Sequence, residues 1–267
     1  MAVEKAGAPV ASPENETRIY EQPLNERLRT YLRLDFLYNQ ALYHNEMASQ
    51  WGSRAAMSCL LDVLAIATRG DIRSDVLKDL ERQLNTLNEF QARPGVDGSR
   101  LRTVMSNLMR LRGELLQAGS AFLQPLRESE FLSAIKHRSA IPGGTCEFDL
   151  PDYYYWLSQP AEVRTQAFTQ WLGMLRQLCD GIAELLWLIR ESGHTSDQVA
   201  TNGSFQHGMV GEGTAGLLRV SLQPGMDLYP EISGSHHRFT IRFMQRPDAL
   251  LRPTQVNKDV RFRLTIC

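Results

Sequence analysis

Five arginines near the end of the chain lie in short segments where apolar and polar residues alternate. They are Arg219, Arg238, Arg242, Arg261 and Arg263. A period of two is typical of a β-strand with one buried face, so these side chains are predicted to point away from the core on one side of a sheet. Guanidinium groups bind carboxylates, and like charges opposed on neighbouring strands cost about 0.2–1 kcal/mol per pair. The pattern indicates an anionic partner, or a solvated face that keeps the sheet soluble.

A second basic cluster lies near the start of the chain. Arg29 and Arg33 are four residues apart in a segment with helical periodicity, so they are predicted to share one helix face. Arg69 comes just before Gly70, where a helix C-terminus is expected. A favourable interaction with the helix dipole would explain Arg69 as well as a binding role does.

The residues at 211–216 have the spelling of a dinucleotide-binding fingerprint, G-x-G-x-x-G. A working fingerprint opens a helix, so that the pyrophosphate meets the helix N-terminus. The residues that follow, 217–222, alternate like a strand, which favours a flexible hairpin loop over a nucleotide-binding enzyme.

Metal and catalytic motifs give no support for an enzyme. The adjacent His236 and His237 would point to opposite faces of a strand, and the four cysteines are widely separated, which is typical of reduced thiols. No hydrolase, zinc-protease or Walker motif occurs in the chain. We therefore expect no metal, no cofactor and no catalytic residue.

Composition and charge narrow the class of partner. The formal net charge is −1, but residues 211–267 carry eight Lys or Arg against five Asp or Glu. A duplex-DNA binder would be far more basic, so nucleic acid is an unlikely partner and a short acidic peptide fits better. No segment has about 20 consecutive apolar residues, and the first ten lack the apolar region of a secretory signal. A cytoplasmic protein without membrane contact is expected.

The elements that must position these residues follow from periodicity. Apolar stripes predict helices from residue 23 to about 117, including one with Leu28, Tyr31, Leu32 and Phe36 facing the core and one with Ser74 as its N-cap. Residues 146–150 alternate like a short strand, and a long helix is predicted from Pro160 to about Gly193. The aromatic run 153–156 is predicted to wedge the sheet against the helices.

These elements predict an α+β fold, with an antiparallel helical bundle domain and a mostly antiparallel, sandwich-like β-sheet domain. Residues 1–18 are predicted to be a disordered tail. The helical domain is assigned 23–138 and 152–193, and the β domain 19–22, 139–151 and 194–267.

Three longer segments, Tyr20–Leu37, Ile141–Pro151 and Leu228–Met244, carry a resemblance to the ZapD family of cell division proteins. It implies a cytosolic, non-enzymatic homodimer, dimerising through its helical domain. Such a protein binds the C-terminal tail of the GTPase FtsZ, bundles FtsZ filaments and stabilises the mid-cell division ring. The matched positions available to the tail are Arg29, Arg33, Arg238 and Arg242, with Arg69 a weaker member. The alternative is a nucleic-acid-binding accessory protein that uses the same arginines on phosphates.

Overall fold

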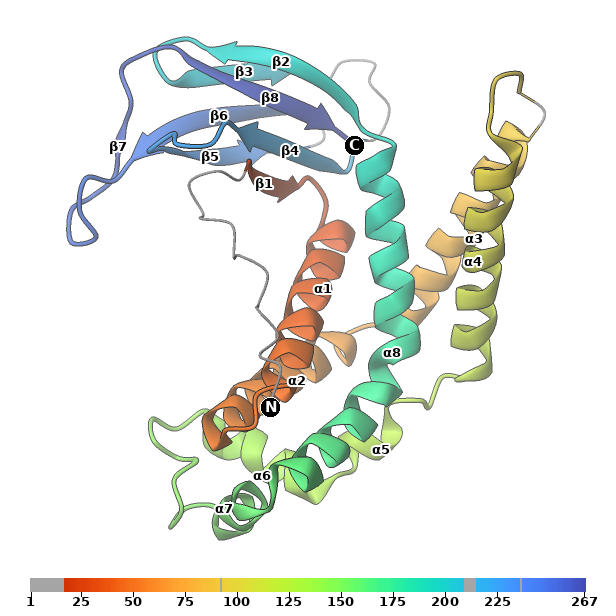
Figure 1. Cartoon of the computed structure of the whole chain (residues 1–267), viewed down its shortest axis with the longest axis vertical. Coiled ribbons are helices and arrows are strands. Elements are labelled where there is room, and N and C mark those ends of the chain that lie inside the picture. Colours follow the sequence, from red (N-terminus) through yellow and green to blue (C-terminus); the bar gives the residue numbers. More distant parts are fainter. Residues whose placement is uncertain (1–16, 92, 209–214, 236) are drawn as a thin grey trace, which may run out of the picture. The chain divides into compact units, whose positions relative to one another are not determined.

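The computed structural model describes residues 17–91, 93–208, 215–235 and 237–267. The chain divides into two compact units, a β unit formed by residues up to Arg29 together with 189–267, and a helical unit formed by 30–188. The α+β fold predicted from the sequence is confirmed, with helices and antiparallel sheets as the two kinds of element (Figure 1).

The helices, in chain order, are α1 Glu26–Asn45, α2 Gln50–Ala67, α3 Ile72–Phe90, α4 Gly98–Gln117, α5 Gln124–Arg127, α6 Glu130–Ser139, α7 Pro151–Ser158 and α8 Ala161–Glu191. The strands are β1 Arg18–Pro23, β2 His194–Ala200, β3 Ser204–Gly208, β4 Leu217–Leu222, β5 Tyr229–Gly234, β6 Arg238–Gln245, β7 Thr254–Gln255 and β8 Val260–Ile266. The long helix predicted from Pro160 is confirmed as α8. Because β1 begins at Arg18, the tail predicted over 1–18 is wrong at its last residue, and 1–16 lie outside the described residues.

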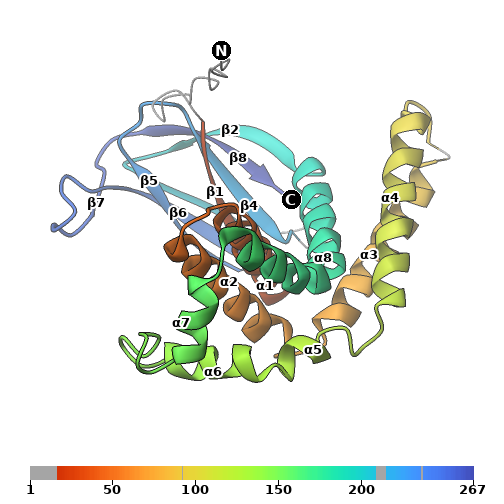
Figure 2. The same cartoon turned by 60° about the horizontal axis from the view of Figure 1, so that its bottom comes forward.

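In the helical unit, α3 and α4 run side by side in opposite directions (Figures 1 and 2). The N-cap of α3 is Asp71, whose carboxylate accepts a hydrogen bond from the Ser74 backbone N–H at 3.1 Å. The prediction that Ser74 is the cap was therefore wrong by one helical turn. Arg73 donates to the carbonyls of Leu115 and Leu116 at the end of α4, which ties the two helices together.

A buried arginine closes the junction between the start of α8 and its neighbours. Arg164 is 6% exposed, and its guanidinium donates to Ser53 Oγ at 3.0 Å, Ala48 O at 2.7 Å and Leu157 O at 3.0 Å, and also to Gln159 O. Because carbonyl and hydroxyl oxygens surround this cation, its burial is tolerated without a carboxylate.

Three local predictions in the helical unit are wrong. Residues 146–150 form turns instead of a strand, and the segment 139–151 belongs to the helical unit and not to the β domain. The aromatic run lies on α7, where Tyr153 and Trp156 contact Phe131, and Trp156 also contacts Trp171. These rings pack among helices because α7 begins at Pro151 and turns them toward α6 and α8.

The β unit contains two antiparallel sheets. Sheet A has the strand order β1-β4-β8-β2, and sheet B the order β3-β6-β5, with β7 paired to β6. Buried side chains from both sheets form one core, among them Val220 and Leu264 from sheet A and Phe239, Ile241 and Phe243 from sheet B. The predicted sandwich-like arrangement is thus found, and each sheet has an outer face turned away from this core (Figure 1).

The chain passes from sheet A to sheet B through a tight turn at Asn202 and Gly203. Both residues have positive φ, 49° and 71°, as a two-residue hairpin turn with the twist of β-strands requires. A Cβ at Gly203 would lie 2.2 Å from the carbonyl oxygen of Val256, so only glycine fits this position. Among the described helices, none is both long enough and apolar enough to cross a bilayer.

Candidate functional site

The five arginines of the strand segments do not share one face, which corrects the prediction. Arg219, Arg261 and Arg263 lie on β4 and β8 of sheet A, while Arg238 and Arg242 lie on β6 of sheet B. Each points outward from its own sheet, because the residues beside it in the strand are buried in the core. Period two predicted the direction of the side chains correctly, but it carries no information about which strands pair.

The sheet B pair has the properties of a carboxylate-binding surface. Arg238 and Arg242 are both exposed and lie on one side of β6, about 13 Å apart along the strand. Within the described residues, the Arg238 side chain has no hydrogen bond or ion pair. Arg242 lies 3.9 Å from the carboxylate of Glu231 on the neighbouring strand, and both side chains are about half exposed. A contact so long and so exposed leaves Arg242 available to another anion.

On sheet A, Arg219 is occupied by an internal ion pair. Glu21 on β1 lies opposite Arg219 on β4, and their charged atoms are 3.0 Å apart. Arg190 at the end of α8 donates two hydrogen bonds of 2.8 Å to the same carboxylate. All three side chains are less than a third exposed. Glu21 therefore holds both guanidinium groups in place, and Arg219 has a structural role.

The two other sheet A arginines lie on β8. Arg263 lies 3.4 Å from Asp197 on β2, and both side chains are mostly exposed. Arg261 is exposed, and the described part of the chain supplies it with no side-chain partner. Neither residue was among the positions assigned to the binding site from the sequence.

The first-helix pair lies on α1 as predicted. Arg33 is exposed, and the described residues offer its side chain no partner; Arg29 is half-buried and lies 3.6 Å from the carboxylate of Glu26 one turn earlier. Phe36 is 64% exposed, so its predicted place in the core is wrong. At 100° per residue, Phe36 falls on the same stripe of α1 as both arginines, because 29, 33 and 36 differ by four and three.

Arg69 follows α2, whose C-cap is Thr68, so the predicted helix end is confirmed to within two residues. Its side chain is exposed and has no partner among the residues that the structure describes, in keeping with either a dipole interaction or binding of an anion. Of the predicted site residues, the structure brings Arg238 and Arg242 together on β6, and Arg29 and Arg33 together on α1. Arg33 and Arg69 belong to the helical unit and the sheet pair to the β unit.

No activated nucleophile or metal site occurs among the described residues. All four cysteines are free, and burial raises the pKa of the Cys59, Cys179 and Cys267 thiols. Raised pKa values keep these thiols protonated and unreactive at neutral pH. The described chain has no cluster of three or more His, Cys, Asp or Glu placed to hold a metal.

The loop at 211–216 with the dinucleotide spelling lies, up to residue 214, outside the described residues, so its predicted flexibility stays a prediction. The segment after it is the strand β4, as predicted. The loop is therefore followed by a strand and not by the helix on which a dinucleotide-binding site depends.

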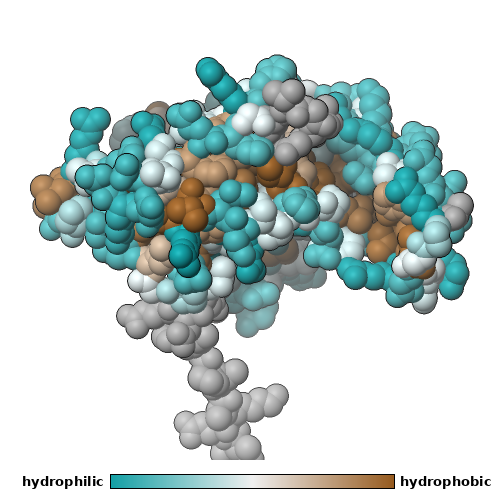
Figure 3. All heavy atoms as spheres, turned by 90° about the horizontal axis from the view of Figure 1, so that it is seen from above, coloured by the Kyte–Doolittle hydropathy of each residue, from teal (hydrophilic) through white to brown (hydrophobic). Residues whose placement is uncertain are grey.

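The surface seen in Figure 3 is largely hydrophilic, and smaller apolar groups lie between the hydrophilic residues. Over the described chain, the large exposed apolar side chains include aromatic residues of the helical unit, notably Phe36, Tyr43, Trp51 and Tyr155. Trp51 is 79% exposed. Single exposed apolar residues are common on proteins, but several large rings in one unit are typical of a surface that contacts another protein.

The sequence as a whole matches known cell division proteins. The model of the ZapD family, described as a cell division protein, matches residues 32–242. A "Cell division protein ZapD" from Methylococcus capsulatus is 36% identical over 249 residues, which cover 93% of this chain and 97% of the relative. A protein of the same name from Chromobacterium violaceum is 38% identical over 248 residues, covering 93% and 98%.

Proposed function

This chain belongs to the ZapD family of cell division proteins, and we propose that it acts as a bivalent adaptor for FtsZ. In this role it binds the C-terminal tail of FtsZ, cross-links neighbouring filaments as a homodimer and stabilises the division ring in the cytoplasm at mid-cell. It carries out no reaction and uses no cofactor.

The observation that carries the proposal is the exposure of Arg238 and Arg242 on sheet B. Both are exposed on one side of β6, and their only described ionic contact is the 3.9 Å approach of Arg242 to Glu231. An extended peptide with acidic residues four positions apart on a matching strand would place a carboxylate near each guanidinium, forming charge-assisted hydrogen bonds. Arg29, Arg33 and Arg69 are proposed as further contacts to the tail.

The proposed dimer supplies the second binding site that cross-linking requires. Exposed pairs between charged side chains contribute only about 0.2–1 kcal/mol each, so one tail site would bind weakly. Two sites held in one dimer raise the effective concentration of the second tail, and bundling then follows without a tight single contact. The exposed rings of the helical unit, such as Phe36 and Trp51, support an interface on that unit.

Co-sedimentation with FtsZ polymer tests the proposal. We expect the wild-type protein to pellet with polymer and to bundle it, and the Arg238→Glu/Arg242→Glu variant to lose both, because each substitution replaces attraction with repulsion. The affinity for the isolated tail peptide should fall at least about tenfold, which corresponds to about 1.4 kcal/mol. The affinity of the wild type should also fall as salt is added.

The matched control is Arg261→Glu/Arg263→Glu, which makes the same charge change on the outer face of sheet A. We expect it to pellet and bundle like the wild type. Undiminished pelleting with FtsZ that lacks its tail would refute the proposed contact, and unchanged bundling by the sheet B variant would remove Arg238 and Arg242 from the site.

A further inference from the structure

The helical unit contains a cavity that the proposed FtsZ site does not use. Its volume is about 520 Å³, and it lies where α2, the end of α6, the turn at 140–145 and the start of α7 meet. Helix α7 contacts both α2 and α6 in this region (Figures 1 and 2). The whole lining belongs to the helical unit. Cavities of about 300–1,000 Å³ are typical binding sites for small molecules.

The cavity has a positive charge that its own lining does not balance. Arg54 is the one charged residue among the described residues that line it, and no Asp or Glu is among them. The Arg54 side chain is half-buried and forms no ion pair within the described chain. Because burying a cation without an anion costs free energy, a negatively charged ligand would be favoured at this position.

Three neighbouring groups hold the guanidinium of Arg54 in place. Its Nη1 donates to Thr145 O at 3.0 Å and to Thr145 Oγ1 at 3.3 Å. Its Cζ lies 5.1 Å from the ring centroid of Tyr153 and 5.7 Å from that of Trp51, within the range of a cation–π interaction.

The fixed guanidinium keeps one of its sides for a ligand. Both hydrogen bonds of Arg54 start from Nη1, so Nε and Nη2 have no acceptor in the part of the chain that the structure describes. The N–H bonds of Nε and Nη2 run parallel on one side of the group, which matches the two oxygens of a carboxylate.

The turn that carries Thr145 is tightly built. Gly144 donates its backbone N–H to Ile141 O at 2.9 Å, and a Cβ at Gly144 would lie 2.5 Å from the carbonyl oxygen of Arg138. Only glycine fits there, so the path of the chain into Thr145 is fixed. Arg54 is therefore oriented before a ligand arrives, and less conformational entropy is lost on binding.

The rest of the lining suits an aromatic group. Met57, Leu61 and Ile135 are buried and give the cavity apolar walls. Trp51 is 79% exposed, so its indole has an open face beside Arg54 on which another ring can stack.

We propose that this cavity binds a small aromatic carboxylate. The carboxylate accepts hydrogen bonds from Nε and Nη2 of Arg54, and the ring lies between Trp51 and the apolar walls. Trp51 then belongs to this site, and the exposed rings of α1, Phe36 and Tyr43, remain for the proposed dimer interface. The proposal concerns the helical unit alone and does not rest on the binding of FtsZ.

Titration of the full chain with 2-naphthoate at pH 7, followed by ligand-observed NMR, tests the site. A ligand of this size should bind with a dissociation constant of about 1 mM or below. The uncharged 2-naphthamide has the same ring and should bind at least about tenfold more weakly, because it loses the charge-assisted hydrogen bonds. Equal affinities, or no binding of 2-naphthoate up to about 10 mM, would overturn the proposal.

The Nε–H signal of Arg54 in a ¹⁵N spectrum locates the ligand. Arg54→Lys identifies this signal, because lysine has no Nε–H. The signal should shift during the titration with 2-naphthoate and stay in place with 2-naphthamide. An unchanged signal at saturating 2-naphthoate would place the ligand elsewhere and contradict the proposal.

Substitutions separate this site from a general attraction of anions. Arg54→Gln should lower the affinity for 2-naphthoate at least about tenfold. Ser58→Phe keeps Arg54 and obstructs the cavity from an exposed position of α2, so it should also abolish binding while the urea midpoint of the helical unit is unchanged. Ser58→Phe decides the case if Arg54→Gln does not fold, and full affinity in Ser58→Phe would refute the site.

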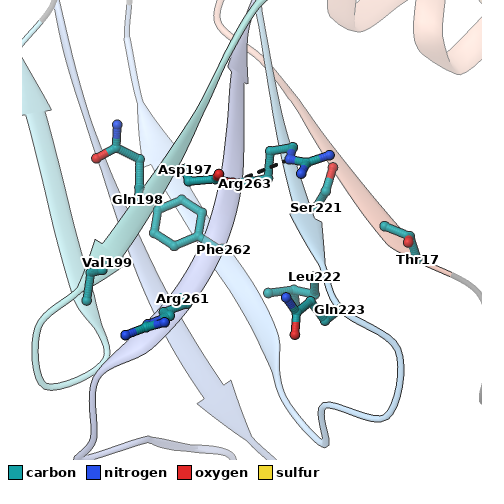
Figure 4. A pocket seen from close by; sticks show the side chains of 10 residues that line it. All are labelled: Thr17, Asp197, Gln198, Val199, Ser221, Leu222, Gln223, Arg261, Phe262 and Arg263. Atoms are coloured by element: carbon teal, nitrogen blue, oxygen red, sulfur yellow. Dashed lines mark hydrogen bonds and ion pairs between the residues drawn. The ribbon is translucent and has the colours of Figure 1, made fainter.

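Arg261→Gln is the matched control. This exposed arginine lines another cavity of about 520 Å³, on the outer face of sheet A, where Figure 4 shows it together with Arg263 and Asp197. We expect Arg261→Gln to bind 2-naphthoate like the wild type. A loss of affinity as large as in Arg54→Gln would show that exposed guanidinium groups in general attract the probe, and the proposal would fail.

Discussion

Replacing Glu21 with glutamine removes the carboxylate that holds two arginines of the β unit in place. Arg190 donates two hydrogen bonds of 2.8 Å to this carboxylate, and Arg219 lies 3.0 Å from it. Glutamine keeps the size of the side chain but loses the charge, so the ion pairs that Glu21 forms with two poorly exposed guanidinium groups are lost. Breaking a fully buried ion pair costs about 3–5 kcal/mol. Because these side chains are 20–27% exposed, water recovers part of that cost, and we expect a loss of about 2–3 kcal/mol.

The assay has to report on the β unit itself. Tryptophan fluorescence does not, since Trp51, Trp156, Trp171 and Trp187 all belong to the helical unit. Hydrogen exchange of the β4 and β8 amides, measured by mass spectrometry across a urea series, follows the right part of the chain. With a urea dependence of about 1–3 kcal/mol per molar, the midpoint for these strands should fall by about 0.7–3 M.

Asp197→Asn is the matched control, because it removes a carboxylate from another arginine of the same sheet face. The Asp197–Arg263 contact is 3.4 Å long and mostly exposed, so we expect a loss below about 0.5 kcal/mol. The reasoning would be refuted if Glu21→Gln shifted the midpoint no more than Asp197→Asn does. Burial of an ion pair would then have no bearing on its contribution to the free energy of unfolding.

Two further predictions concern the helical unit, and tryptophan fluorescence follows both. Arg164→Met should cost about 3–5 kcal/mol in urea unfolding, because it leaves buried carbonyl oxygens without a donor; a loss below about 1 kcal/mol would show that water replaces the guanidinium. Burial raises the pKa of Tyr153 from 10.0 to about 12, with Arg54 opposing the shift. The folded unit therefore holds the Tyr153 hydroxyl proton more tightly than the unfolded chain does, so the stability of the unit should fall as pH rises from 10 toward 12. The wild type should show a lower urea midpoint at pH 11 than at pH 9, and Tyr153→Phe should reduce this difference.

The sequence predicted the individual helices and strands far better than the contacts between them. Period two correctly placed Arg238 and Arg261 on the outside of their strands, because the alternation is a local property of the backbone. It could not assign them to different sheets, because strand pairing depends on residues far apart in the chain. The same limit hid Glu21, whose two arginines lie 169 and 198 positions away.

Other errors had a signal that was present in the sequence. The dipeptide Asn202-Gly203 is a strong sequence signal for a hairpin turn, and it marks the point where the chain passes from one sheet to the other. Pro151 suits the first turn of a helix, which favours α7 over a strand ending there. Phe36 had no such signal: its spacing fits both the buried stripe and the stripe of Arg29 and Arg33, and only packing decides between them.

The pairing of β1 with β4 affects the order in which the two units can fold during synthesis. Pro23 pairs with Leu217, so nearly 200 residues must leave the ribosome after β1 before its partner exists. At about 5–20 residues per second, the first strand waits on the order of 10–40 s with its backbone groups unpaired. The whole of 30–188 is translated in that interval, so the helical unit has all its residues while sheet A still lacks its inner strands.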